Sequence, residues 1–287
     1  MLTYSQAANP TDRVSRDIDH VLAHGRTHYQ EYLFFRSQAH GVCVALDGDI
    51  QSCESDEAIY HEALAHPALL IHPRPRKVLI MGGGEGATAR EALRHDCVER
   101  VVMVDIDREF VDLCRELIPG WSAGVYDDPR LEVHYEDINE YLERTGERFD
   151  VVIGDLVDVQ DWDAPAGDLY SRDFYAALTG CMRDGGVFAS QAGALSTVDM
   201  DNHNRIRARI AKSLPRVRSY GLVVPSFYHM WSFVLGSAAP LDCGGASLAE
   251  CFDERVGGRG VGLPATGSGT LAGAFLLPRL LADALKG

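Results

Sequence analysis

The first part of the chain shows short β-type runs separated by turn residues. Residues 32–35 and 42–46 are rich in apolar and aromatic side chains, and Asp47-Gly48-Asp49 follows the second run directly. An Asp-Gly pair between two such runs is a strong hairpin signal, because glycine adopts the positive φ that tight turns require. We therefore expect a small antiparallel sheet at the N-terminus.

A helix and two prolines follow this predicted sheet. Residues 57–70 carry apolar side chains near helical spacing, and Pro73 and Pro75 come directly after them. Proline removes a backbone donor and ends helices, so the prolines predict a boundary. We place an N-terminal β-domain with its linking helix at residues 1–72 and a second domain at residues 73–287.

After the prolines, short apolar runs alternate with longer amphipathic segments. The predicted strands are residues 78–81, 101–104, 131–134, 151–153, 187–190, 222–224 and 231–235, and the predicted helices are residues 87–94, 109–118, 139–144, 171–183 and 199–214. Apolar strands between helices are typical of a parallel sheet that is covered on both faces. We predict a doubly wound α/β domain, Rossmann-like, with a mostly parallel seven-stranded sheet. The Gly-rich residues 256–269 are expected to form a surface loop before a last helix at 276–285.

Composition narrows the classes of partner. The 287 residues carry a net charge of −15, which opposes binding to nucleic acid and attracts small cations. No apolar run approaches the ~18 residues of a membrane span, and no basic segment followed by an apolar stretch opens the chain, so we expect a cytoplasmic protein without membrane contact. The seven cysteines are odd in number and form no C-x-x-C pair, and we interpret them as buried thiols. His20, His24 and His28 would share one helical face, but no carboxylate pattern supports a metal site there.

A glycine turn after the first strand of the second domain is the strongest local signal. Gly82-Gly83-Gly84-Glu85-Gly86 follows an apolar strand and precedes a helix, which is where nucleotide-binding sheets approach their ligands. Glu85 in this turn would repel a pyrophosphate but would attract a sulfonium or an ammonium group. The sequence therefore favours a cationic nucleoside over a dinucleotide.

Further acids follow the next three strands. Asp105 stands where an acid accepts hydrogen bonds from a ribose, and Asp137 stands where an adenine amine could be bound. Either aspartate could equally be a helix N-cap. Asp155 and Asp158 follow the fourth strand. Because converging carboxylates raise one another's pKa values unless cations lie between them, the cluster indicates a polycationic substrate.

Taken together, these residues resemble the polyamine aminopropyltransferases, the spermidine synthase family. The motifs that carry the resemblance are Tyr29-Gln30, Asp47-Gly-Asp-Ile-Gln51, Asp56-Glu-x-x-Tyr60-His61-Glu62, His66-Pro67, Gly82-Gly-Gly-Glu-Gly86, Val104-Asp-Ile-Asp107, Tyr126-Asp-Asp-Pro-Arg130, Asp155-x-x-Asp158 and Ser190-Gln-Ala-Gly193. The resemblance implies a homodimer or homotetramer that transfers an aminopropyl group from decarboxylated S-adenosylmethionine, as co-substrate, to a polyamine. It implies no metal and no permanently bound cofactor.

The resemblance also implies roles for individual residues. By its position in the motif, Asp155 resembles the catalytic base of the family. The residues expected to bind the amines are Tyr60, His61, Glu85, Asp155, Asp158 and Phe227. Those expected to bind the nucleoside of the donor, or the product methylthioadenosine, are Gln30, Gly82, Gly84, Asp105, Asp137, Ile138 and Pro165.

Two departures from the usual family pattern bear on the acceptor. The catalytic loop reads Gly154-Asp-Leu-Val-Asp158, and a late Pro-Thr-Tyr motif is replaced by Pro225-Ser-Phe227. Both are similar to the thermospermine synthase branch, which extends spermidine, whereas putrescine is the acceptor for spermidine synthases.

Three other functions are alternatives to aminopropyl transfer: an S-adenosylmethionine-dependent methyltransferase, an NAD-dependent oxidoreductase and a non-catalytic polyamine-binding protein. The first shares the nucleoside pocket, the second lacks the Gly-x-Gly-x-x-Gly spacing, and the third would keep the acidic cleft.

Overall fold

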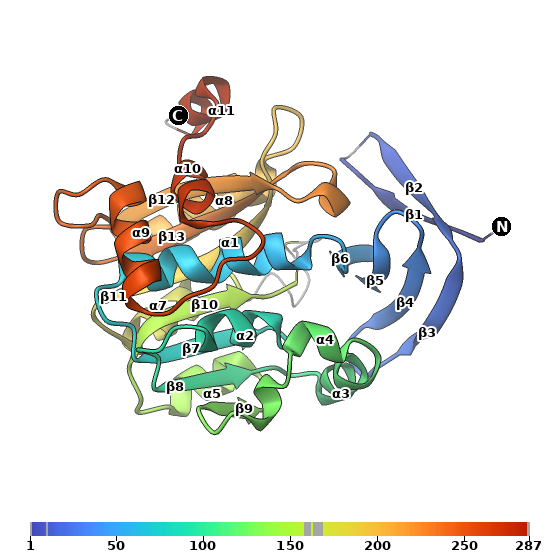
Figure 1. Cartoon of the computed structure of the whole chain (residues 1–287), viewed down its shortest axis with the longest axis horizontal. Helices are drawn as coiled ribbons and strands as arrows, with labels where there is room; N and C mark the ends of the chain where they lie inside the picture. Colours follow the sequence, from blue (N-terminus) through green and yellow to red (C-terminus); the bar gives the residue numbers. More distant parts are fainter. Residues whose placement is uncertain (1, 10, 158–161, 163–168, 286–287) are drawn as a thin grey trace.

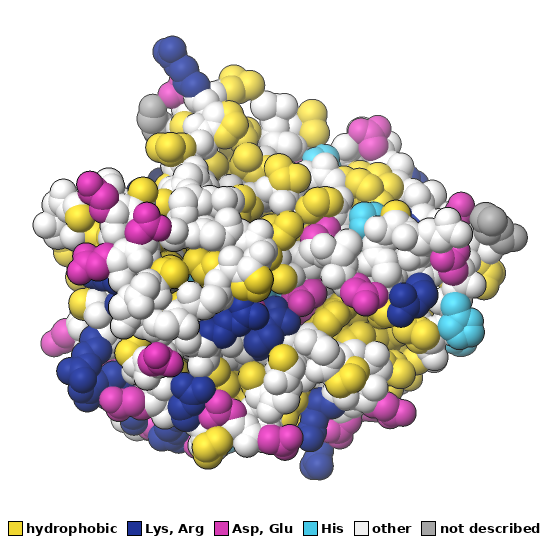
Figure 2. Space-filling model, in the orientation of Figure 1, with side chains coloured by type: hydrophobic (Ala, Val, Ile, Leu, Met, Phe, Trp, Pro, Cys, Tyr) yellow, Lys and Arg dark blue, Asp and Glu magenta, His cyan; other side chains and the backbone are white. Residues whose placement is uncertain are grey.

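The computed structural model describes residues 2–9, 11–157, 162 and 169–285 (Figure 1). Within these residues, no helix is long and apolar enough to cross a membrane. Acidic side chains are scattered over the face shown in Figure 2, with Lys and Arg between them.

The N-terminal part consists of two antiparallel sheets, shown in blue in Figure 1. The strands are β1 (Leu2–Ala7) and β2 (Arg13–Ile18) in one sheet, and β3 (His20–Arg26), β4 (Glu31–Ser37), β5 (Gly41–Leu46) and β6 (Asp49–Cys53) in the other. Asp47 and Gly48 both have positive φ, so the predicted hairpin turn between β5 and β6 is confirmed. β1, β2 and β3 were not predicted. His20 and His24 lie on β3, so they do not share a helical face.

A buried helix follows the sheets. α1 (Glu57–Ile71) confirms the predicted helix and continues through an internal proline, Pro67. It packs against α2 (Ala87–Leu93) and against the central sheet. Tyr60, in the first turn of the helix, reaches Asp155 at the carboxyl end of β10 (Phe149–Asp155).

The central sheet has seven strands, as predicted. They are β7 (Lys77–Gly82), β8 (Arg100–Val104), β9 (Leu131–His134), β10 (Phe149–Asp155), β11 (Met182–Ala194), β12 (Arg216–Val223) and β13 (Met230–Ser237), in the order β12-β13-β11-β10-β7-β8-β9. All neighbours are parallel except the pairs that β13 makes with β11 and β12. The strand order reverses between β7 and β10, which is the position where open α/β sheets bind ligands.

Helices cover both faces of the sheet because its strands are apolar on both sides. The other helices in the described part of the chain are α3 (Arg108–Leu117), α4 (Pro119–Ser122), α5 (Ile138–Arg144), α7 (Arg172–Gly180), α8 (Asp201–Ser213), α9 (Leu248–Gly258), α10 (Ser268–Gly273) and α11 (Arg279–Ala284), with single turns η1 (Val125–Asp127) and η2 (Pro225–Phe227). Val78 and Ile80 of β7 join the core beneath α1, α2, α9 and α10, whereas Leu79 and Met81 join the core beneath α5, α7 and α8. This alternation is the doubly wound arrangement.

Two expectations about the C-terminal part are wrong. Residues 256–269 are not simply a loop, because α9 extends to Gly258 and α10 begins at Ser268. Cys243 and Cys251 form a disulfide, so the cysteines are not all thiols. Their sequence separation of 8 gave no recognisable framework pattern, and α9 brings them together.

Candidate active site

A cavity of about 460 Å³ opens at the carboxyl ends of β7, β8 and β10, beneath the N-terminal sheet. It brings together most of the residues expected from the sequence, namely Gln30, Tyr60, His61, Gly82, Gly84, Glu85, Asp105, Asp137, Ile138 and Asp155. Phe227 lies outside the lining residues and packs against the ring of Tyr60, with centroids 5.7 Å apart. Asp158 and Pro165 lie outside the described residues.

Asp155 ends β10 with its carboxylate in the cavity. Its Oδ1 accepts a hydrogen bond from the Tyr60 hydroxyl at 3.1 Å, and its Oδ2 accepts one from Thr88 Oγ1 at 2.6 Å. Thr88 was not singled out from the sequence, although a hydroxyl in the first turn of a helix after a glycine turn is a recognisable signal. The two hydroxyls orient the carboxylate from two different helices, α1 and α2.

The glycine turn allows β7 to pass directly against β10 and Asp105. A Cβ at Gly82, whose φ is +77°, would overlap the backbone oxygen of Asp155. A Cβ at Gly84 would lie 3.0 Å from Oδ2 of Asp105. A side chain at Gly82 would therefore collide with the backbone of Asp155 and one at Gly84 would crowd the Asp105 carboxylate, and glycine avoids both contacts.

Glu85 forms part of the cavity wall and is only 9% exposed. Its Oε1 accepts a 2.6 Å hydrogen bond from Ser52 Oγ of β6, and its Oε2 lies 3.5 Å from Nε2 of His61. Burial raises the pKa of Glu85 to about 7, although His61 and Ser52 favour its charged form. Ser52 was missed from the sequence, because a serine inside a strand carries no signal of its partner.

His61 lies on the other side of Glu85 and is 2% exposed. Its Nδ1 is 2.7 Å from the carbonyl oxygen of Glu57 and 3.0 Å from Oε2 of the same residue. Burial opposes the charged form, but the hydrogen bond and the charge of Glu57, with the charges of Asp155 and Glu85, raise the pKa of His61 to about 9. The imidazole is therefore cationic at neutral pH and lies between the carboxyl groups of Glu57 and Glu85.

Asp105, Asp137 and Gln30, the residues expected to bind a nucleoside, also line the cavity. Burial raises the pKa of Asp105 to about 6, and its Oδ1 accepts a hydrogen bond from the Asp107 amide at 2.9 Å. Asp107 in turn accepts a 2.9 Å hydrogen bond from Gln30 Nε2. Asp137 caps α5 by accepting from the Asn139 amide at 2.7 Å, so it serves as an N-cap as well as lining the cavity.

The side chains around the cavity are typical of one class of protein. Carboxylates at a strand-order reversal line one cavity, and a basic imidazole lies beside them. No group of three His, Cys, Asp or Glu side chains able to hold a metal ion occurs among the described residues. Fold and cavity are those of a Rossmann-like transferase that binds a nucleoside and a cationic group side by side.

Comparison with known proteins identifies the family. Residues 57–242 match the spermine/spermidine synthase domain, and residues 3–54 match the spermidine synthase tetramerisation domain. The chain belongs to the spermine/spermidine synthase family, and it is a polyamine aminopropyltransferase, an enzyme of polyamine biosynthesis.

Individual relatives agree with this assignment. The chain is 46% identical to a polyamine aminopropyltransferase of Aeropyrum pernix over 79% of this chain and 72% of the relative. It is 35% identical to a thermospermine synthase of Arabidopsis thaliana over 89% of this chain and 75% of the relative. A spermidine synthase solved with the transition-state analogue AdoDATO superposes with a TM-score of 0.89 at 30% identity, covering 99% of this chain and 95% of that one. The spermidine synthase of Thermotoga maritima superposes with a TM-score of 0.87 at 29% identity, covering 100% and 94%.

Proposed function

We propose that the chain transfers the aminopropyl group of decarboxylated S-adenosylmethionine to an amine of a polyamine, with Asp155 as the base. The observation that carries this proposal is the position of Asp155. Its carboxylate lies at the strand-order reversal, in the same cavity as Asp105 and Glu85, and is oriented by the hydroxyls of Tyr60 and Thr88. A base must reach the amine that attacks the donor, and an oriented carboxylate in this cavity supports that role.

The reaction is a single displacement. The lone pair of the acceptor amine forms a bond to the carbon next to the sulfonium, and the carbon–sulfur bond breaks with its electrons going to sulfur. The products are methylthioadenosine and an amine extended by one aminopropyl group, and the proton leaving nitrogen passes to Asp155. An alkyl ammonium resembles lysine, with a pKa of about 10.4, so freeing its lone pair at pH 7 costs roughly 4–5 kcal/mol.

The other cavity residues divide between the two substrates. Gln30, Asp105, Asp137 and Ile138 are proposed to hold the nucleoside, and Gly82 and Gly84 to leave room for it. Tyr60, His61 and Glu85 are proposed to hold ammonium groups, because two carboxylates, Asp155 and Glu85, face the same cavity. Asp158, Pro165 and Phe227 keep their roles as predictions from the family motifs.

Spermidine is the acceptor we favour, and putrescine is the alternative. Gly154-Asp-Leu-Val-Asp158 and Pro225-Ser-Phe227 are similar to the thermospermine synthase branch, and a relative of that name is 35% identical. Phe227 has no hydroxyl with which to bind an amine, and this suits a longer and partly apolar acceptor.

The test is an acceptor panel. Purified protein is incubated with decarboxylated S-adenosylmethionine and, in separate tubes, putrescine, spermidine or agmatine, and the products are identified by chromatography and mass. We expect spermidine to gain one aminopropyl group faster than putrescine does. A faster reaction with putrescine would overturn the choice of acceptor.

Two other functions remain as outcomes of the same panel. A methyltransferase would transfer a methyl group from S-adenosylmethionine, which is included as a second donor. A non-catalytic polyamine-binding protein would bind spermidine but consume neither donor. Either result would overturn aminopropyl transfer.

The assembly is proposed to be a homotetramer, with a homodimer as the alternative. Residues 3–54 match a tetramerisation domain, and they form the two N-terminal sheets. Light scattering on the purified protein should give four times the chain mass of 31.5 kDa. A monomer would contradict an oligomer of either size. A cytoplasmic location remains a prediction from the sequence.

A further inference from the structure

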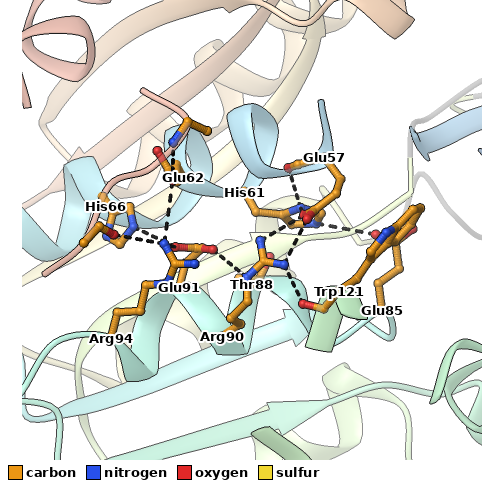
Figure 3. Close-up of polar contacts among 12 residues, drawn as sticks. Glu57, His61, Glu62, His66, Glu85, Thr88, Arg90, Glu91, Arg94 and Trp121 are labelled. Carbon is orange, nitrogen blue, oxygen red and sulfur yellow. Dashed lines mark hydrogen bonds and ion pairs between the residues drawn. The ribbon is translucent and has the colours of Figure 1, made fainter. Parts of the chain in front are cut away.

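The wall of the cavity behind Glu85 is supported by a buried chain of charged side chains between α1 and α2 (Figure 3). From the cavity inwards, its members are Glu85, His61, Glu57 and Arg90. All four are less than 10% exposed. Only the first two line the cavity, so the function described above gives no role to Glu57 or Arg90.

Arg90 holds the carboxylate of Glu57 in one orientation. Its Nη1 lies 3.0 Å from Oε1 and its Nη2 lies 2.9 Å from Oε2, which is the two-pronged geometry that fixes a carboxylate most firmly. Nη1 also donates to the carbonyl oxygen of Trp121 at 2.6 Å. Arg90 therefore ties the Glu57 carboxylate to α2 and to the backbone of α4.

Glu57 in turn fixes the protonation of the His61 ring. Both groups within reach of Nδ1 are acceptors, the carbonyl and the carboxylate of Glu57, so Nδ1 must carry a hydrogen. Nε2 is thereby left to face Oε2 of Glu85 at 3.5 Å. When Glu85 is ionised, a second hydrogen on Nε2 places an imidazolium between two carboxylates.

A ligand ammonium at Glu85 would compete with that imidazolium for the same carboxylate. The charged or titratable groups that face His61 are Glu57 on its own helix, Glu85 on the glycine turn and Asp155 on β10, with Arg90 behind Glu57 and the ring of Tyr60 at its edge. One positive charge is enough to balance the Glu85 carboxylate. If the ammonium bound while His61 was still protonated, the ammonium and the imidazolium would repel each other.

We propose that Glu57, held by Arg90, is a positioning residue that keeps a proton on Nε2 of His61 beside Glu85, and that the ammonium group of an incoming substrate displaces this proton. The proton passes from Nε2 to bulk water, the ammonium keeps its own protons, and the charge beside Glu85 is unchanged. The negative charge of Glu85 is thus balanced by the His61 imidazolium until the amine binds. This inference rests on the proposed function, because it requires a substrate with an ammonium group.

The test counts protons released on binding. Heats of binding are measured by titration calorimetry at pH 8 in buffers of different ionisation enthalpy, for decarboxylated S-adenosylmethionine, for methylthioadenosine, and for putrescine added to the methylthioadenosine complex. At this pH Glu85, with a pKa of about 7, is ionised, whereas His61, with a pKa of about 9, is protonated. We expect about one proton to be released by the ligand that places its ammonium at Glu85, and none by methylthioadenosine alone.

Matched variants assign the proton to His61. Glu57→Gln should abolish the release and strengthen binding of the amine about tenfold at pH 8, with a smaller change in kcat, because the His61 imidazolium is no longer stabilised and the amine has no proton to displace. Glu62→Gln is the control: Glu62 is buried on the same helix one turn later, but it accepts from the Ala265 and Thr266 amides at 3.1 and 2.8 Å and does not line the cavity. Amine binding to Glu62→Gln should release as many protons as amine binding to the unmodified protein.

The unmodified protein also tests the proposal if Glu57→Gln does not fold. Its proton release should decline as the pH rises through 9, where His61 loses its own proton. No release at pH 8 by either amine ligand, in a protein that binds and turns over both substrates, would overturn the inference alone. A release that persists in folded Glu57→Gln would also overturn it. Absence of both turnover and amine binding would instead count against the proposed function.

Discussion

Replacement of Asp155 by asparagine tests the proposed base without changing the shape of the site. Tyr60 approaches Oδ1 at 3.1 Å and Thr88 approaches Oδ2 at 2.6 Å. Because both hydroxyls can either donate or accept, an asparagine amide can bond to both, accepting from one and donating to the other. Asp155→Asn therefore removes the charge and the proton acceptor while keeping the hydrogen bonds.

The expected loss of rate follows from the chemistry. A positioned base contributes about 10²–10⁴ in rate, which corresponds to about 2.7–5.4 kcal/mol of transition-state stabilisation. We expect kcat to fall by at least ~10². Affinity for methylthioadenosine should change less than about threefold, because that ligand has no amine to place against Asp155.

The assay compares two asparagine variants on the same strand. Asp155→Asn and Asp150→Asn are assayed for turnover by product mass, for methylthioadenosine affinity by calorimetry and for folding by thermal unfolding. Asp150 is 5% exposed at the start of β10 and accepts from the Arg76 and Lys77 amides at 2.9 and 2.8 Å, away from the cavity. Its replacement should lower the unfolding temperature but keep turnover. Near-normal turnover in Asp155→Asn would refute the base role.

Three further predictions concern the pocket, its pH dependence and the disulfide. Gly84→Ala should weaken methylthioadenosine binding about tenfold in calorimetry, since its Cβ would crowd Asp105 at 3.0 Å; unchanged affinity would contradict this. The pKa of Glu85, about 7, lies above the ordinary 4.5, so its carboxyl is neutral at pH 5 and ionised at pH 8. Millimolar spermidine should therefore raise the unfolding temperature more at pH 8 than at pH 5, and an equal rise would count against Glu85 as an ammonium partner. Reduction of Cys243–Cys251 should lower the free energy of unfolding by ~2 kcal/mol in denaturant titrations, with kcat unchanged because neither cysteine lines the cavity.

The sheet of the second domain was predictable because its strands are apolar on both faces. β7, β8 and β10 have no polar alternation, and a run of that kind has few other structures open to it. β1 and β3 were missed for the opposite reason: most of their side chains are exposed or half-buried, and polar residues there hide the strand pattern. α9 carried a readable signal, since Ser247 and Glu250 form a capping box at its start.

The cavity residues were predictable where a strand end or a motif marks them, as for Asp105 and Asp155. Their hydrogen-bond partners were harder to predict. Ser52 gives no signal of its partner, and the place of Thr88 after the glycine turn is recognisable but does not show that its hydroxyl meets Asp155. Glu57 is an exception. Glu57 and His61 are four residues apart on a helix, which places them on one face, and that spacing could have been recognised.

The most direct test of aminopropyl transfer is the stoichiometry of a single reaction. Purified protein, decarboxylated S-adenosylmethionine and spermidine are mixed, and methylthioadenosine and the extended amine are quantified together over time. Transfer by direct displacement predicts that the two products appear at equal rates and in equal amounts, with one aminopropyl group gained for each donor consumed. Methylthioadenosine formed without an extended amine, or no consumption of the donor by folded protein, would contradict it.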